Sequence, residues 1–128
     1  GDLMAKNMRE MLSMLAQRPE EDRREMLSEM LDMLYSMPEE RAQAMMGQML
    51  QAMSELPPEE AERLTRSRLA VLAGYPDRKR RWLMQQHRAE VGRHPEGVQA
   101  RDRETTEMTV PRLSENERQA VMATMSES

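Results

Sequence analysis

Methionine side chains are the most regular feature of this sequence that could do chemistry. The chain of 128 residues contains 16 Met and no Cys. At ~100° per residue, one row of four shares a single side of a helix: Met26, Met30, Met33 and Met37. Such a row can be hydrophobic core, an adaptable apolar face for a partner, or a set of thioether ligands for Cu(I).

Cu(I) binding is the least favoured of these three interpretations. Methionine copper sites usually include His or Cys, and residues 1–56, which hold most of the Met, contain neither. Interleaved Leu residues also indicate packing rather than coordination. We therefore expect no metal and no cofactor, and keep a methionine-based Cu(I)-binding protein as an alternative.

The two histidines lie seven residues apart, which places His87 and His94 about 10 Å apart along a helix. A metal pair on one helix needs a spacing of three or four residues. Counted from the preceding proline, His87 takes the place that Met30 and Met49 hold in earlier segments. We interpret both histidines as a polar, half-exposed end of the core, with a ligand or proton-switch role as the alternative.

A basic segment lies in the second half of a chain whose net charge is −4. Its residues form a candidate docking patch for an acidic partner or for phosphate groups: Arg78, Lys79, Arg80, Arg81, Trp82 and Arg88. Four consecutive cations on a helix point in all directions, which favours a solvated face paired with neighbouring acids. The negative net charge argues against a nucleic-acid partner.

No arrangement of residues typical of an enzyme is present. The sequence has no Cys nucleophile, no Gly-rich phosphate loop, no G-x-S-x-G and no H-E-x-x-H. Its carboxylates gather where a helix dipole accounts for them, just after prolines. We expect a protein that is not an enzyme.

Prolines divide the chain into units of similar length. Pro19, Pro38, Pro58, Pro76 and Pro95 recur at intervals of roughly 19 residues, and acidic residues follow most of them. Proline at a first helical position wastes no hydrogen bond, so each proline predicts a helix start. We expect helices over about 3–17, 20–36, 39–55, 59–73 and 77–92, packed as an all-α antiparallel stack or bundle.

The sequence predicts three parts. Residues 1–95 form the helical repeat domain, residues 96–113 a linker or extended arm with no apolar period, and residues 114–126 a short C-terminal helix. A capping box of Ser114 and Glu117 starts that helix. No run approaches the ~18–20 apolar residues of a membrane span, so no transmembrane segment is expected. The lack of Cys suits any compartment, with the cytoplasm slightly favoured.

Two resemblances accompany these patterns. The composition of the first ~55 residues is similar to that of the methionine-rich domain of the signal recognition particle and of the target grooves of calmodulin. The proline-started units resemble helical stacks of short Pro-Glu-Glu repeats in bacterial proteins. These likenesses imply helical binding surfaces and assign no role to any residue.

These observations predict a non-enzymatic interaction module, such as a small chaperone, an assembly factor or an accessory subunit. Its partner would be a protein that places a hydrophobic or amphipathic helix in a Met-rich groove of the first three helices. The candidate groove residues are Met8, Met11, Met26, Met30, Met33, Met45, Met46 and Met49. The alternative, besides copper, is a structural protein that self-associates into a homo-oligomer.

Overall fold

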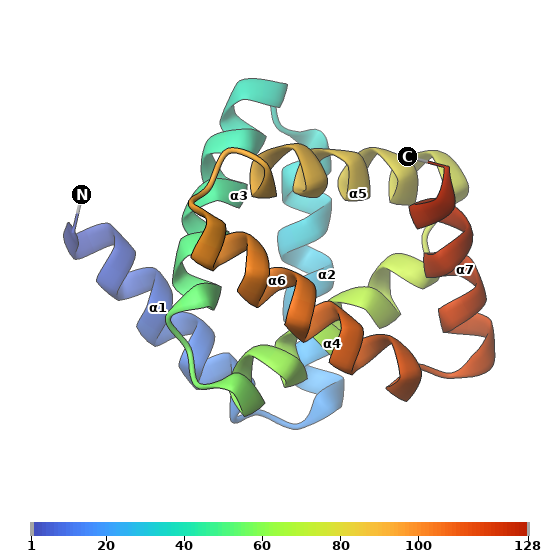
Figure 1. Cartoon of the computed structure of the whole chain (residues 1–128), viewed down its shortest axis with the longest axis horizontal. Helices are drawn as coiled ribbons and strands as arrows, with labels where there is room; N and C mark the ends of the chain where they lie inside the picture. The colour runs from blue at the N-terminus through green and yellow to red at the C-terminus, as the bar shows by residue number, and fades with distance from the viewer. Residues whose placement is uncertain (1, 128) are drawn as a thin grey trace.

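The computed structural model describes residues 2–127, apart from the side chains of Asp2, Met4 and Ala5. Over this range the chain is all-α, with seven α-helices, one 3-10 turn and no strand. The elements are α1 (Asp2–Ala16), α2 (Glu20–Ser36), α3 (Glu39–Ser54), α4 (Pro58–Ala73), α5 (Asp77–Val91), α6 (Glu96–Thr109), η1 (Val110–Arg112) and α7 (Glu115–Ser126). Figure 1 shows them as a stack from which the first turns of α1 project.

The helix starts follow a period of 19 residues. The residue before each helix from α2 to α7 is Pro19, Pro38, Pro57, Pro76, Pro95 and Ser114. The third of these differs from the expected start, because Pro57 caps α4 and Pro58 is its first helical residue. Each capping proline has extended ψ, which ends the preceding helix and lets the next begin. The register of every helix can therefore be counted from its N-cap.

Residues 96–113 are not the linker or extended arm that the sequence predicted, because most of them form α6 and η1. The buried side chains of α6 are Val98, Thr105 and Thr109. Each threonine hydroxyl donates to the backbone carbonyl four residues earlier, at 2.8 Å and 2.7 Å, which allows it to be buried. Because two of the buried residues are threonines, α6 lacks the apolar period by which a buried helix face is recognised in a sequence. The capping box of Ser114 and Glu117 is confirmed at the start of α7.

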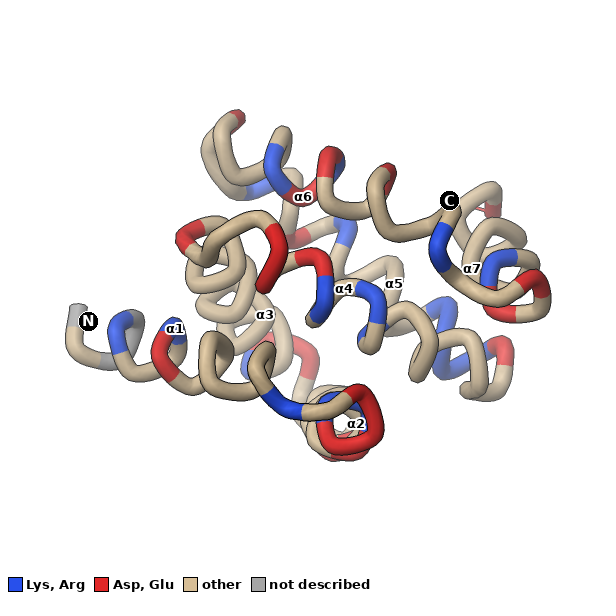
Figure 2. The backbone as a smooth tube through the Cα atoms, turned by 90° about the horizontal axis from the view of Figure 1, so that it is seen from below, with Lys and Arg blue, Asp and Glu red and all other residues tan. Residues whose placement is uncertain are grey.

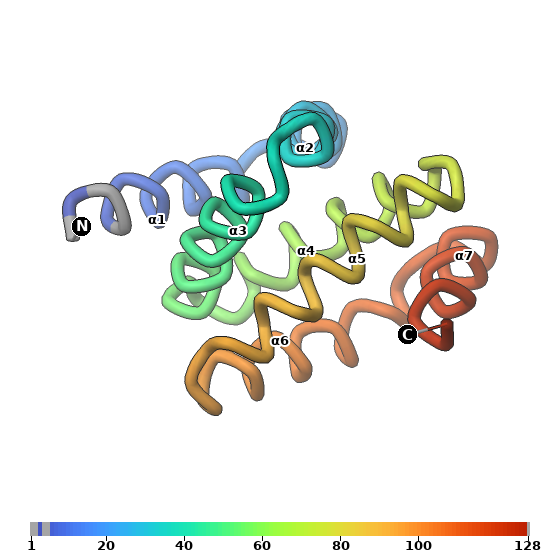
Figure 3. Tube along the Cα trace, turned by 90° about the horizontal axis from the view of Figure 1, so that it is seen from above, coloured from blue at the N-terminus to red at the C-terminus, as the bar shows by residue number. Residues whose placement is uncertain are grey.

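Helices pack mainly against those two or three places further along the chain, and less against their chain neighbours. Side-chain hydrogen bonds between α2 and the α4–α5 region show the register. Arg23 bonds to Ser67 and Asp32 bonds to Lys79, offsets of 44 and 47 residues. The first half of α2 therefore contacts α4, and its second half contacts α5. Figure 3 shows the resulting succession of helices from above.

The side chain four residues after the N-cap locks several helix junctions. It donates to the carbonyl just before the N-cap in four cases: Arg23 to Arg18 O, Arg80 to Tyr75 O, Gln99 to His94 O and Arg118 to Leu113 O. That carbonyl belongs to the last turn of the preceding element and would otherwise lack a partner. This hydrogen bond recurs at the same place in the repeat and fixes the angle between successive helices.

Leucine, not methionine, fills the centre of the stack. The largest fully buried side chains include Leu12, Leu34, Leu64 and Leu83. Among the methionines whose side chains the structure describes, only Met46 is buried, whereas Met11 and Met33 are each 44% exposed. Leu has fewer rotamers than Met and specifies packing better, so the placement suits a defined core.

Candidate ligand-binding cavity

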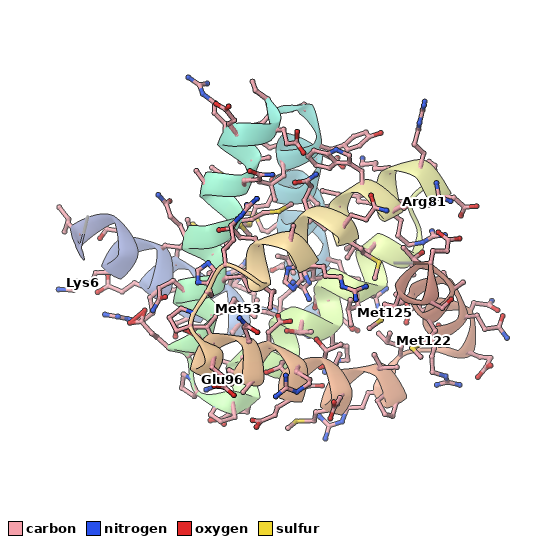
Figure 4. The ribbon with its side chains drawn as sticks, turned by 45° about the horizontal axis from the view of Figure 1, so that its top comes forward. Lys6, Met53, Arg81, Glu96, Met122 and Met125 are labelled. Carbon is pink, nitrogen blue, oxygen red and sulfur yellow. The ribbon has the colours of Figure 1, made fainter. Side chains whose placement is uncertain are left out.

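A cavity of about 510 Å³ lies inside the stack. Its apolar wall comes from leucines and methionines of α1 to α5, among them Leu31, Met49 and Leu69. Figure 4 labels two lining residues, Met53 on α3 at the left of the view and Met125 on α7 at the right. The exposed lining residues belong to α5, α6 and α7, so the cavity opens between these helices.

One position of the repeat supplies a side chain to the cavity from five successive helices. It is the eleventh residue after the N-cap, and in α3 to α7 it is Met49, Arg68, His87, Thr106 and Met125. A constant spacing of N-caps turns the same face of each helix inward. The change from Met to Arg, His and Thr at this position makes one wall of the cavity polar.

Three of the polar side chains form a hydrogen-bonded chain across α4, α5 and α6. Arg68 Nη1 lies 3.1 Å from His87 Nδ1, and His87 Nε2 lies 3.1 Å from Asp102 Oδ1. A guanidinium can only donate, so Nδ1 of His87 must accept. His87 is then the neutral tautomer that carries its proton on Nε2 and donates it to Asp102.

Burial and neighbouring charges shift the pKa values of these three side chains. Burial lowers the pKa of His87, the guanidinium of Arg68 lowers it further, and Asp102 opposes both effects. Burial also lowers the pKa of Arg68 from a very high ordinary value, against the attraction of Asp102. For Asp102 burial alone would raise the pKa, but the hydrogen bond from His87 and the nearby Arg68 bring it below its ordinary value. Each shift is consistent with a neutral His87 between two charged neighbours.

The three hydrogen-bonded side chains position a cation, that of Arg68, rather than activating a nucleophile. In a catalytic triad the histidine removes a proton from a serine or cysteine, whereas here its first partner is Arg68, which keeps its proton. Arg68 Nε is inaccessible to water and has no hydrogen-bond partner. Within the part of the chain that the structure describes, no group of three or more His, Cys, Asp or Glu could hold a metal ion. The chemistry that this wall offers is recognition of charge.

The predicted groove methionines are distributed over different surroundings. Met46 and Met49 line the cavity. Met8 and Met30 pack against the apolar cluster that α1 to α4 share, and Met45 packs against a second cluster that extends to α7.

The remaining candidates, Met11, Met26 and Met33, are exposed on α1 and α2, at 44%, 45% and 44%. The structure therefore does not bring the eight methionines together in a single groove.

The predicted basic patch is also divided among several neighbours. Arg80 is 7% exposed and donates to Thr124 Oγ1 at 2.8 Å, besides its junction bond to Tyr75 O. Lys79 binds Asp32 at 2.7 Å and lies 3.9 Å from the centre of the Tyr75 ring.

Arg81 pairs with Glu127 at 2.8 Å, and the Trp82 ring meets that of Tyr35 edge-on at 5.4 Å. Arg78 and Arg88 are exposed, and Arg88 lies at the mouth of the cavity. In Figure 2 basic and acidic residues are interspersed over the helices. The segment supplies structural bonds and solvated charges rather than one compact basic surface.

Arg68 and Asp102 were not singled out as site residues from the sequence, although the repeat contains the signal for them. Counted from Pro57 instead of Pro58, Arg68 takes the register of Met30 and Met49. Asp102, seven residues after Pro95, takes the register of leucines and methionines such as Leu83. A charged residue at a position that is apolar in other repeats is the pattern that identifies both.

Comparison with known proteins assigns no relative. No family model, curated protein or solved structure matches the chain. No described helix has the length and apolar character needed to cross a bilayer.

Proposed function

We propose that this protein is a non-enzymatic binding module whose ligand occupies the cavity inside the helical stack. The observation that carries the proposal is the cavity of about 510 Å³ with an apolar wall and one convergent polar chain. Ligand sites are typically concave, mostly apolar and of ~300–1,000 Å³, with a few polar groups that orient the ligand. The ring nitrogens of His87 bond to Arg68 and Asp102 rather than to a hydroxyl or thiol, which favours binding over catalysis.

The size of the cavity favours a small ligand over a whole helix. One turn of α-helix, ~10–12 Å wide and ~5.4 Å long, occupies on the order of 500 Å³. The cavity is no larger than one such turn, so a partner helix could insert only a few side chains. A small apolar or amphiphilic molecule fits the whole space.

Binding of the neutral dye Nile red tests the proposal. The wild-type chain should bind one dye molecule in an apolar environment, detected as a fluorescence increase with one-to-one stoichiometry. Met84→Trp and Thr106→Trp, which enlarge side chains on different walls of the cavity, should each lose most of that signal. Met33→Trp is the matched control, because Met33 lies on the outer side of α2.

Circular dichroism and thermal melting should show that each variant is folded. Equal dye binding by the wild type and both blocked variants would contradict the proposal, as would no binding by the wild type.

Self-association is a second candidate function, supported by where apolar side chains remain exposed. Among the described residues, large exposed apolar side chains occur on α1, α2, α6 and α7 and not on α3 to α5. Because helices pack against those two or three places away, helices at either end of the stack lack some of these partners. A second copy of the chain could cover these faces.

Sedimentation velocity tests this second candidate. A dimer or larger species at micromolar concentration, converted to monomer by the combined change Met11→Gln, Met26→Gln and Met33→Gln, would support it. A wild-type chain that stays monomeric throughout would remove it.

A further inference from the structure

We propose that the ligand of the cavity is an amphiphile with an aliphatic chain and a terminal carboxylate, whose carboxylate binds the guanidinium of Arg68. This inference rests on the proposed function and names the chemistry of its ligand. The carboxylate selects the ligand, and the aliphatic chain occupies the Leu- and Met-lined space behind it.

Arg68 is held in position but is not fully used. His87 accepts one of its N–H groups, and Asp102 holds His87 through the opposite ring nitrogen. Arg68 Nε remains inaccessible and has no partner. Three other arginines share this state of Nε, so it does not by itself mark a ligand site. Nη2 of Arg68 bonds no described residue and is not among the inaccessible atoms, so a ligand in the cavity can accept a hydrogen bond from it.

The charges around the cavity favour an anion over a cation. The lining includes three arginines, Arg68, Arg88 and Arg103, against two carboxylates, Asp102 and Glu107. Asp102 already accepts from His87, and Glu107 is exposed at the mouth. The carboxylate that acts electrostatically on Arg68, Asp102, is therefore already bonded to another side chain.

The aliphatic part of the ligand is inferred from the apolar residues that line the rest of the cavity. The lining residues of α1 to α3 are all leucine or methionine, and those of α4 are leucines apart from Arg68. An unbranched chain gains by leaving water for such a surface, and methionine side chains adapt to its shape. Guanidinium groups bind carboxylates through paired N–H donors, which makes a carboxylate the natural head for such a chain.

Competition for bound Nile red tests this inference on the intact chain. Decanoate, decanol and decyltrimethylammonium share a ten-carbon chain and differ in the charge of the head. Decanoate should displace the dye at a concentration about 10- to 100-fold lower than decanol, the ratio expected of a hydrogen bond to a charged group. Decyltrimethylammonium should compete less well than decanol. All concentrations stay below micelle formation.

Two further measurements link the preference to Arg68. Arg68→Gln should bring decanoate and decanol to similar competition, each compared with the dye affinity of that variant. Arg78→Gln, which removes an exposed arginine of α5 outside the cavity, should keep the wild-type preference. In nuclear magnetic resonance spectra of the wild type, the Arg68 Nε–H signal should shift with decanoate and stay in place with decanol, a readout that needs no variant.

The outcomes separate the two proposals. If Nile red binds but decanol competes as well as decanoate, the carboxylate inference fails and the binding cavity stands. If the preference survives Arg68→Gln, or the Arg68 Nε–H signal does not respond, the anion is recognised elsewhere and the inference fails. If neither the dye nor any ten-carbon compound binds the wild type, the proposed function fails with it.

Discussion

The first three helices and the next three use the same repeat position differently. Eleven residues after the N-cap, α2 and α3 carry Met30 and Met49, whereas α4 and α5 carry Arg68 and His87. One position later α2, α3 and α4 all carry leucine, and the change to a charged residue comes at Arg88 of α5. The first half keeps the apolar register of a stack, and the second half departs from it at the wall of the cavity.

This difference separates what builds the fold from what the proposed site requires. Polar residues at an apolar register are destabilising unless they are paired, and among the described residues Arg68, His87 and Asp102 form hydrogen bonds with one another. Places where local rules are broken in an otherwise regular protein are often functional. The eight methionines predicted as a groove all lie in the first three helices, and of these Met46 and Met49 line the cavity.

The largest expected effect comes from the Leu core of the first half. Leu34→Ala removes a side chain that is 1% exposed and should lower the free energy of unfolding by about 2–5 kcal/mol. Met33→Ala, the adjacent change on the outer side of α2, should stay within about 0.5 kcal/mol. Urea unfolding of both variants measures the difference. Similar losses at the two positions would show that Met and Leu share the core equally.

Restoring the apolar register in the second half gives the sharpest test of the comparison. The triple change Arg68→Met, His87→Met and Asp102→Leu places repeat-like residues at all three positions. We expect the free energy of unfolding to rise by about 1–4 kcal/mol, because paired buried charges are often less stabilising than apolar residues of similar volume. A marked decrease in the free energy of unfolding, measured with urea, would mean that the three polar side chains stabilise the fold. The distinction between a structural first half and a functional second half would then be wrong.

Equivalent junction arginines should behave alike in both halves. Arg23→Ala and Arg80→Ala each remove a buried donor from a carbonyl and from a hydroxyl, Ser67 or Thr124. Each change should lower the free energy of unfolding by about 1–3 kcal/mol because buried acceptors lose their partners. The exposed Arg78→Ala serves as control, with little change expected. A large loss at only one junction would show that this recurring hydrogen bond does not have the same role in both halves.

The smallest effect is a dependence on pH that belongs to the second half. Since the pKa of folded His87 is lowered, the unfolded chain binds a proton more readily, so stability should fall as pH drops below the ordinary histidine value of about 6.5. The lowered pKa of Asp102 acts in the same direction at more acidic pH. Arg68, Arg88, Arg103 and Glu107 are the other charged groups around this cavity.

Urea unfolding between pH 7.5 and 5 measures this dependence. His87→Met should lose the part of the slope that begins near pH 6.5. An identical slope in the wild type and this variant would show that His87 does not titrate as its surroundings require.

The sequence by itself determined the helices and their period. Proline at the N-caps, acids in first turns and the Ser114 capping box act within a few residues, so the chain encodes them locally. The same reasoning failed for α6, where Thr105 and Thr109 replace the apolar residues that mark a buried face. It also failed by one residue at Pro57, which hid the register of Arg68.

Only the tertiary structure decided which helices meet and therefore where a site could form. Packing between helices two and three places apart depends on burial of apolar surface from distant segments, which no local pattern specifies. That packing turns position eleven inward in successive helices, so the consecutive helices α4, α5 and α6 place Arg68, His87 and Asp102 on one wall. Short-range forces set each helix, and long-range burial arranged three charged or titratable side chains into one wall.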